Sequence, residues 1–315
     1  MKQIFVLALS LFLFFHTQAQ LKKPTVPVKK ETTAKPPVKV VERVKIVEKD
    51  NDRDGDGIID VMDKCPDEWG ELKNEGCPKQ EINKISNSNK NEIINNFTLK
   101  MILIQGGLFN MGSNNGNFDE KPIHTVSISS FYMATTEVTQ ELWNLFMDIN
   151  PSNFKGDNLP VENVSWIDCQ TFILKLNKFT GNEYRLPTEA EWEFAAKGGI
   201  YGSFFNYSGS NFIDDVGWCD ANSQNITHPV AQKAANKLGL FDMSGNVSEW
   251  CSDWLGNYKN YEETNPSGPS TGTYRAFRGG GYILNEQCCR VSRRSGDLPE
   301  SRYFSLGFRL VRSIQ

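Results

Sequence analysis

Almost nothing in the sequence after Gly199 is periodic. Roughly 110 residues rich in Gly, Asn, Ser and aromatic side chains follow, interrupted by short apolar pieces such as residues 308–311. The chain as a whole is 39% hydrophobic and 11% aromatic, which favours an ordered core over disorder. A loop-rich region of this length therefore indicates a functional surface held by metal ions, disulfides or buried polar networks.

One stretch inside this region, residues 239–250, gathers two aromatics, two glycines, an Asn and two acids. It is too polar for a core strand and too apolar for a solvated loop, so we predict a buried, shaped loop. Asp242 and Glu249 bracket a Ser-Gly-Asn turn, and two converging carboxylates offer hard oxygen ligands to an ion of calcium's size. The alternative is a turn whose acids face water.

The first 20 residues have the pattern of a secretory signal, with one Lys, an apolar run over residues 4–15 and small polar residues around Ala19. We predict a cleaved signal peptide over residues 1–19. No Cys follows the cleavage site, as a lipoprotein would need, and no later stretch is apolar enough to span a bilayer. We therefore expect a secreted or periplasmic protein of the cell envelope. The net charge of −4 gives no footprint for nucleic acid.

Residues 20–49 are rich in Lys, Pro and Val and contain no aromatic residue, so we interpret them as an extended linker. Residues 50–78 differ, because their acids keep the phase of a calcium-binding loop with Gly57 at the sharp turn. An acidic solvated linker, the alternative, would not keep that phase. The predicted calcium ligands are Asp52, Asp54, Asp56, Ile58 through its carbonyl, Asp60 and Asp63.

A Cys65–Cys77 disulfide would close a small loop beside these acids and contribute about 3 kcal/mol in the chain-entropy model. Calcium and a disulfide together could order a segment that has almost no core. The pattern over residues 50–78 resembles a single thrombospondin type 3 repeat. Residues 79–97, rich in Asn, Lys and Ser, are interpreted as a second linker before a globular domain over residues 98–315.

Within that domain, alternation around Gly106-Gly107 predicts two strands joined by a turn over residues 101–112, and residues 123–132 predict another strand. Three helices are predicted from their capping signals. They run from Thr139 to about Met147, from Ser165 to about Phe179 with Gly181 ending the helix, and from Thr188 through Lys197. Trp192 and Trp250 are predicted as core anchors, and Arg185 and Arg309 as partners of Glu189, Glu191 or Glu193 in buried ion pairs.

Several short segments of the domain occur in the order typical of one family. They are residues 106–113, 137–139, 160–166, 185–193, 239–250, 278–280 and 307–309. Together they resemble the sulfatase-modifying factor family, whose best-known members are formylglycine-generating enzymes, over about residues 98–312. The resemblance implies an α+β domain of the formylglycine-generating enzyme type, related to the C-type lectin-like fold and low in regular secondary structure.

The resemblance also implies a calcium site in the stretch 239–250, with side-chain and carbonyl oxygens as ligands. The matching positions are Asp242, Gly245, Val247 and Glu249. The family's second calcium site is matched only by Asn222 and Ser223, because the segment that carries its other ligands is shortened. Calcium is therefore the cofactor that we expect.

Catalytic residues of the family are replaced in this chain. Formylglycine-generating enzymes have a Ser after the Gly-Gly pair and, three residues later, the first of two copper-binding cysteines; Gly281 and Leu284 stand there instead. The adjacent Cys288 and Cys289 are the only candidates for a displaced thiol site, and neighbouring residues of a strand point to opposite faces, which suits linear copper coordination poorly. Copper is therefore not expected. The two thiols could instead join disulfides with Cys169, Cys219 or Cys251, or be buried and unpaired.

Beyond the signal segment the sequence has two histidines, His124 and His228, which we expect to be surface or hydrogen-bonded residues rather than metal ligands. These features predict a non-catalytic, calcium-stabilised binding or assembly module of the cell envelope, with a protein partner or envelope component. The alternative is an oxidoreductase that converts a cysteine of a protein such as a sulfatase to formylglycine, with Cys288 and Cys289 as a displaced thiol site.

Overall fold

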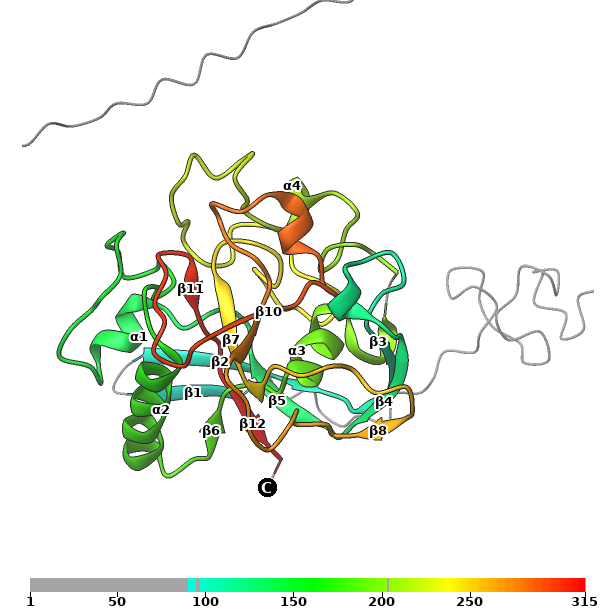
Figure 1. The fold of residues 1–315 in the computed structure, drawn as a ribbon. Helices are drawn as coiled ribbons and strands as arrows, with labels where there is room; N and C mark the ends of the chain where they lie inside the picture. Colours follow the sequence, from blue (N-terminus) through cyan, green and yellow to red (C-terminus); the bar gives the residue numbers. More distant parts are fainter. Residues whose placement is uncertain (1–89, 95–96, 203, 315) are drawn as a thin grey trace, which may run out of the picture. The chain divides into compact units, whose positions relative to one another are not determined.

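The described part of the chain contains three separate sheets of short strands (Figure 1). This computed structural model describes residues 90–94, 97–202 and 204–314, all within the unit Glu81–Gln315. The predicted signal peptide, first linker, calcium repeat and Cys65–Cys77 disulfide lie outside the described residues. The low content of regular structure agrees with the α+β fold class expected from the sequence.

The largest sheet has five strands in the order β1-β2-β5-β12-β6, with antiparallel pairing throughout. Its strands are β1 (Lys90–Ile94), β2 (Phe97–Ile104), β5 (Phe131–Ala134), β12 (Val311–Ser313) and β6 (Tyr184–Arg185). The last strand of the domain thus lies between strands that come from its first half. This pairing places the segment around Arg309, just before β12, next to residues that are far away in the sequence.

The second sheet has the order β10-β9-β7-β11, and the third has the order β3-β4-β8. Their strands are β10 (Ser295–Asp297), β9 (Arg275–Arg278), β7 (Ser248–Trp254), β11 (Leu306–Gly307), β3 (Gly107–Met111), β4 (His124–Ile128) and β8 (Glu263–Thr264). The pairs β7–β11 and β4–β8 are parallel. The stretch predicted as a buried loop, residues 239–250, overlaps β7 at Ser248–Trp250, so its end lies in an interior strand of the second sheet.

All three helices predicted from capping signals are present. They are α1 (Gln140–Asn144), α2 (Trp166–Thr180) and α3 (Glu189–Ala196), and a fourth short helix, α4 (Ile213–Val216), was not predicted. Thr139, Ser165 and Thr188 are the N-caps, and the last two form reciprocal capping boxes with Asp168 and Glu191. Gly181 ends α2 in the left-handed region, as expected. Helix α1 is shorter than predicted. The described residues also form the 3₁₀ turns η2 (Phe118–Glu120), η3 (Gly199–Tyr201) and η4 (Glu286–Cys289).

The single strand predicted over residues 123–132 is wrong. The chain there forms β4 and β5, which belong to different sheets. The chain passes from one sheet to the other at Ser129-Ser130. This point lies opposite Gly106, where the chain passes between the same two sheets from β2 to β3. The Ser130 hydroxyl accepts a hydrogen bond from the Gly106 amide at 2.9 Å. Alternating apolar residues continue through this crossing, so the pattern alone could not reveal it.

Two apolar clusters form most of the core. One packs Phe172 of α2 between Trp143, stacked at a ring distance of 5.3 Å, and Phe308. The other surrounds α3 and includes Trp192. Trp192 and Trp250 are both fully buried, which confirms their prediction as core anchors. Figure 1 shows α3 between β3 and β7, in contact with both. Helix α3 therefore connects the second and third sheets.

Candidate functional site

Residues 242–250 are all buried, as predicted, and residues 242–247 form a loop, but Ser248–Trp250 belong to strand β7, so the prediction of a loop is wrong there. The loop turns tightly because Asp242, Gly245 and Asn246 adopt positive φ angles of 57°, 92° and 58°. At Gly245 a Cβ atom would lie 2.2 Å from the Trp218 carbonyl oxygen, so only glycine fits there. The backbone of this loop is thus fixed by close packing as well as by its sequence.

Asp242 and Glu249 lie in one buried cluster with a third carboxylate, Glu137, and a single guanidinium, Arg309. Arg309 donates to both carboxylate oxygens of Glu249 at 2.7 Å, and the Trp192 indole donates to the same carboxylate at 2.7 Å. The remaining donors of Arg309 bind the carbonyls of Ala134 and Phe241. Arg309 therefore neutralises Glu249 and leaves two carboxylates without a cation.

Those two carboxylates each have one oxygen without a partner. Asp242 accepts a hydrogen bond from the Ala231 amide through Oδ2, and Glu137 accepts one from Asn246 through Oε1. Asp242 Oδ1 and Glu137 Oε2 are buried and have no hydrogen-bond partner. Buried carboxylate oxygens are rarely left in this state unless a proton or a cation binds them.

The electrostatics of the cluster agree with this geometry. Burial, together with the charges of Asp242 and Glu249, raises the pKa of Glu137 well above its usual value. Burial raises the pKa of Asp242 to about 6, and the Glu249 charge adds to the rise, while the Ala231 amide, Arg309 and a hydrogen bond with the Glu137 carboxyl group oppose it. The raised pKa values mean that Glu137 and Asp242 bind protons more readily than ordinary carboxyl groups, because Arg309 is the only cation of the cluster and it pairs with Glu249.

Hard oxygen ligands with an excess of negative charge fit a calcium ion. Among the described residues, no group of three or more His, Cys, Asp or Glu side chains is arranged to hold a metal. A cation here would therefore need backbone carbonyls as well, the kind of ligand expected from Gly245 and Val247. Glu249 Oε1 accepts one hydrogen bond from Arg309 and keeps a lone pair for an ion. In this cluster Asp242 Oδ1 and Glu137 Oε2 are the buried oxygens without a partner, so they are the side-chain atoms that an ion could contact.

Sequence reasoning missed Glu137 and gave Arg309 the wrong partner. Glu137 lies in the segment 137–139, one of those that carry the family resemblance. It directly precedes the buried Val138 and the helix cap Thr139, and this position could have indicated that its side chain is buried. Arg309 pairs with Glu249, not with an acid of α3. The predicted partner of Arg185 is confirmed, since it binds both carboxylate oxygens of Glu191 at 2.6 and 2.7 Å.

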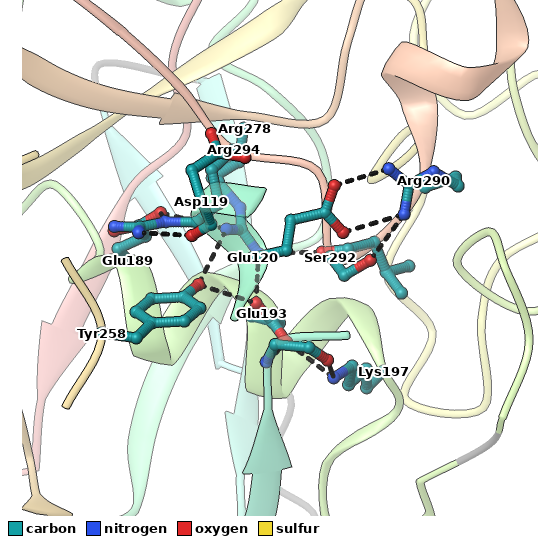
Figure 2. A network of polar contacts seen from close by, with 12 residues as sticks. Asp119, Glu120, Glu189, Glu193, Lys197, Tyr258, Arg278, Arg290, Ser292 and Arg294 are labelled. Atoms are coloured by element: carbon teal, nitrogen blue, oxygen red, sulfur yellow. Dashed lines mark hydrogen bonds and ion pairs between the residues drawn. The ribbon is translucent and has the colours of Figure 1, made fainter. Parts of the chain in front are cut away.

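The two other acids of α3 belong to a second polar network, which Figure 2 shows. Glu189 pairs with Arg278 at 3.0 Å and Arg294 at 2.5 Å, and Glu193 pairs with Arg278 and with Lys197 at 2.6 Å. At its edge Glu120 binds Arg290 at 2.6 Å. Every carboxylate of this network has a cationic partner, so the network fixes architecture by joining α3 to β9 and to residues 290–294.

At the position of the family's catalytic Ser, Gly281 is tightly enclosed. A Cβ atom there would lie 2.9 Å from the Ser305 Cβ and 3.1 Å from the Ser305 carbonyl oxygen. A contact below 3.0 Å requires something to shift, and the nearest atom here belongs to the Ser305 side chain. A side chain at position 281 would therefore need Ser305 to move.

Cys288 and Cys289 have different surroundings. Cys289 is fully buried, and burial raises the pKa of its thiol well above the usual value. Cys288 is half-buried and lines a groove with a volume of about 1110 Å³. This groove, which we call the amide groove, is bounded by Leu108, Asn115, Ile200, Asn206, Cys288 and Arg293. The structure thus separates the two thiols rather than directing them at one ion.

Both histidines are hydrogen-bonded, as expected. His124 Nδ1 lies 3.2 Å from the Pro122 carbonyl, and His228 Nε2 lies 2.8 Å from the Ser223 carbonyl. Asn222 and Ser223, the two positions that the resemblance matches to a second calcium site, also bond within loops, to Gly217 and Tyr282. Among the described helices, none is long and apolar enough to cross a membrane.

Residues 89–314 match the family model described as the sulfatase-modifying factor enzyme 1-like domain. The chaperone protein LppX of Paenibacillus barcinonensis is 34% identical over 242 residues, covering 61% of this chain and 81% of that protein. The formylglycine-generating enzyme of Streptomyces coelicolor is 36% identical over 170 residues, covering 48% of this chain and 52% of the enzyme. Among solved structures, variable protein 1 of Treponema denticola has a TM-score of 0.68 at 31% identity, covering 71% of this chain and 99% of that chain.

Proposed function

Since this chain belongs to the family of sulfatase-modifying factor enzyme 1-like domains, we propose that it is a non-catalytic member that acts as a calcium-stabilised binding or assembly module of the cell envelope. The observation that carries the proposal is the enclosure of Gly281 by Ser305. A serine at the position where the family resemblance implies one would require Ser305 to move. The glycine therefore suits the packing of this part of the domain.

The state of the thiols supports the same conclusion. Oxygen activation on copper needs thiolate ligands, because the thiolate is the form that binds metal. Cys289 is buried with a raised pKa, and Leu284 stands where the first family cysteine is expected. One half-buried thiol, Cys288, remains, and a single thiolate does not make a linear two-sulfur site.

The amide groove is the surface that we assign to a protein partner. Its rim carries Asn and Gln side chains, which can both donate to and accept from a peptide backbone, while exposed Leu108 and Ile200 offer apolar contact. A similar protein, LppX, is named a chaperone, which is consistent with a role in binding other proteins.

In this proposal calcium fixes the loop at the centre of the domain. Asp242 and Glu249 would hold the ion together with the carbonyls of Gly245 and Val247, and Glu137 would supply a further oxygen. The bound cation would balance the excess negative charge of the cluster and so stabilise the ionised carboxylates. The predicted amino-terminal repeat would bind a second ion, and the signal peptide would direct the chain to the envelope.

The alternative is a formylglycine-generating oxidoreductase. The one observation that favours it is that Cys288 lines a groove large enough for a peptide. That activity would have to proceed without the family's serine and with Cys288 as its accessible thiol.

Two leucine variants test the binding role. Leu108 is 62% exposed in the amide groove, whereas Leu174 is 71% exposed on α2 and does not line it. We expect cross-linking in native envelopes to join the wild-type chain to a defined protein, and Leu108→Asp to reduce that product at least tenfold. Leu174→Asp, which adds the same charge at a matched exposed site, should preserve it. Equal yields from the two variants would contradict the assignment of the groove.

A further inference from the structure

Two of the five cysteines in the described part of the chain share one small apolar cluster. Cys219 and Cys289 are both fully buried, and the cluster contains only three other residues, Tyr207, Ile213 and Val216. Cys219 follows α4, and Cys289 ends the turn η4, so the two are far apart in sequence. The fold thus brings together two thiols that no local pattern links.

Hydrogen bonds hold the two cysteine-bearing segments side by side. The amide of Asp220, next to Cys219, donates to the Leu284 carbonyl at 3.0 Å. The Ser223 hydroxyl donates to the Tyr282 carbonyl at 2.7 Å. Cys219 and Cys289 pack in the same buried cluster, and in the described structure both are free thiols.

The other three cysteines of this region have different neighbours. Cys169 packs in the cluster of α2, and Cys251 packs in the cluster of α3. Cys288 faces the amide groove rather than the small apolar cluster. As adjacent residues, Cys288 and Cys289 are also poorly placed to bond with each other. Cys219 is therefore the best-placed partner of Cys289.

We propose that Cys219 and Cys289 form a disulfide that fastens the loop around residues 217–223 to the segment 281–289, leaving Cys288 as the accessible thiol. The bond forms by exchange with an external disulfide, such as oxidised glutathione or a disulfide oxidoreductase, before the cluster closes during folding. The two thiols lose two protons and two electrons as the S–S bond forms. The external disulfide accepts both electrons and leaves as two thiols.

The inference goes beyond the proposed function, because it assigns a covalent structural role to a segment where the family has catalytic residues. A bond between residues 219 and 289 would close a loop of about 70 residues, so it would restrict the unfolded chain strongly. It would also fix Gly281 and Leu284 in their present packing. The segment would then be a permanent structural support of the groove wall that carries Cys288.

Peptide mapping of the full chain tests the pairing. The protein is folded in a glutathione redox buffer, treated with iodoacetamide in denaturant without reductant, digested and analysed by mass spectrometry. Besides the predicted Cys65–Cys77 pair, we expect one linked peptide pair containing Cys219 and Cys289, with Cys169, Cys251 and Cys288 alkylated. Alkylation of Cys219 and Cys289 themselves, or linkage of either one to Cys288, would overturn the proposal.

Thermal unfolding provides a second readout. In a Cys65→Ser/Cys77→Ser background, which removes the predicted amino-terminal bridge, reductant should lower the Tm by about 10 °C. Cys288→Ser should keep this response, whereas Cys219→Ser should already melt at the lower temperature and no longer respond. A response to reductant that survives in Cys219→Ser would contradict the assigned pair.

Discussion

At the scale of single residues, the decisive feature is the imbalance between three buried carboxylates and one guanidinium. Glu249 is neutralised by Arg309, while Asp242 and Glu137 each keep an oxygen without a partner. A buried carboxylate without a cation is energetically unfavourable, because its desolvation is not compensated by an opposite charge. The cluster is therefore best explained as a place where a cation or a proton binds.

The pH dependence of stability tests this explanation. A carboxyl group whose pKa is higher in the folded than in the unfolded protein stabilises the fold at low pH, and that contribution is lost as the pH rises to the folded pKa. For Asp242 the window runs from its ordinary value of 3.8 to about 6. In calcium-free buffer, wild type should lose about 2 to 3 kcal/mol more than Asp242→Asn between pH 4 and pH 7.

Urea denaturation at several pH values, with chelator present, measures this difference. Calcium added at pH 7 should raise the stability of wild type but not that of Asp242→Asn, because the variant lacks the free carboxylate oxygen. A difference between the two proteins that stays constant from pH 4 to pH 7 would argue against a raised pKa at Asp242.

The ion pair of Arg309 gives a second prediction at this scale. Arg309→Met would leave Glu249 buried without its cation, and we expect a loss of about 3 to 5 kcal/mol. Arg185→Met is the matched control, because Arg185 also binds a glutamate through two oxygens but its side chain is 36% exposed. That variant should lose no more than about 1 kcal/mol. Comparable losses in chemical denaturation would show that burial of the Arg309 pair is unimportant.

At the scale of elements, local capping determines where the helices begin. Ser165 caps α2 and accepts a hydrogen bond from the Asp168 amide at 3.1 Å. Ser165→Ala should destabilise the protein by about 1 kcal/mol and lower the Tm by about 2 to 4 °C. Thr171→Ala, in the same helix, removes an exposed hydroxyl bonded to the Ile167 carbonyl and should change stability by less than about 0.5 kcal/mol. If scanning calorimetry found the two shifts equal, the capping role of Ser165 would be disproved.

The same distinction explains how much the sequence could predict. Caps and the Gly106-Gly107 turn act over a few residues, so three helix starts and the separation of β2 from β3 were predictable. The insertion of β12 between β5 and β6 depends on contacts across more than a hundred residues and has no local signature. For the same reason Asp242 and Glu249 could be predicted as one site, whereas Glu137 and the partner of Arg309 come from distant segments and could not.

At the scale of the whole molecule, two separate calcium sites are proposed, one in the domain and one in the predicted repeat outside the described residues. Calorimetric titration of the full chain should resolve two binding events. Asp56→Ala should abolish only calcium binding to the repeat, and the melting temperature of the domain should stay the same. Asp242→Asn should abolish only calcium binding to the domain, and with it the rise in melting temperature that calcium causes. One event that disappears in both variants would mean that the sites are not independent.

Whether the domain retains any family chemistry is decided by incubating the full chain with copper(I), oxygen and a Cys-x-Pro-x-Arg peptide and following the peptide by mass spectrometry. Because glycine replaces the family's serine at position 281 and Cys289 is buried, we expect no conversion of the peptide cysteine to an aldehyde, with an authentic formylglycine-generating enzyme as positive control. Aldehyde formation by the wild-type chain that is lost in Cys288→Ser would contradict a non-catalytic role and establish the oxidoreductase instead.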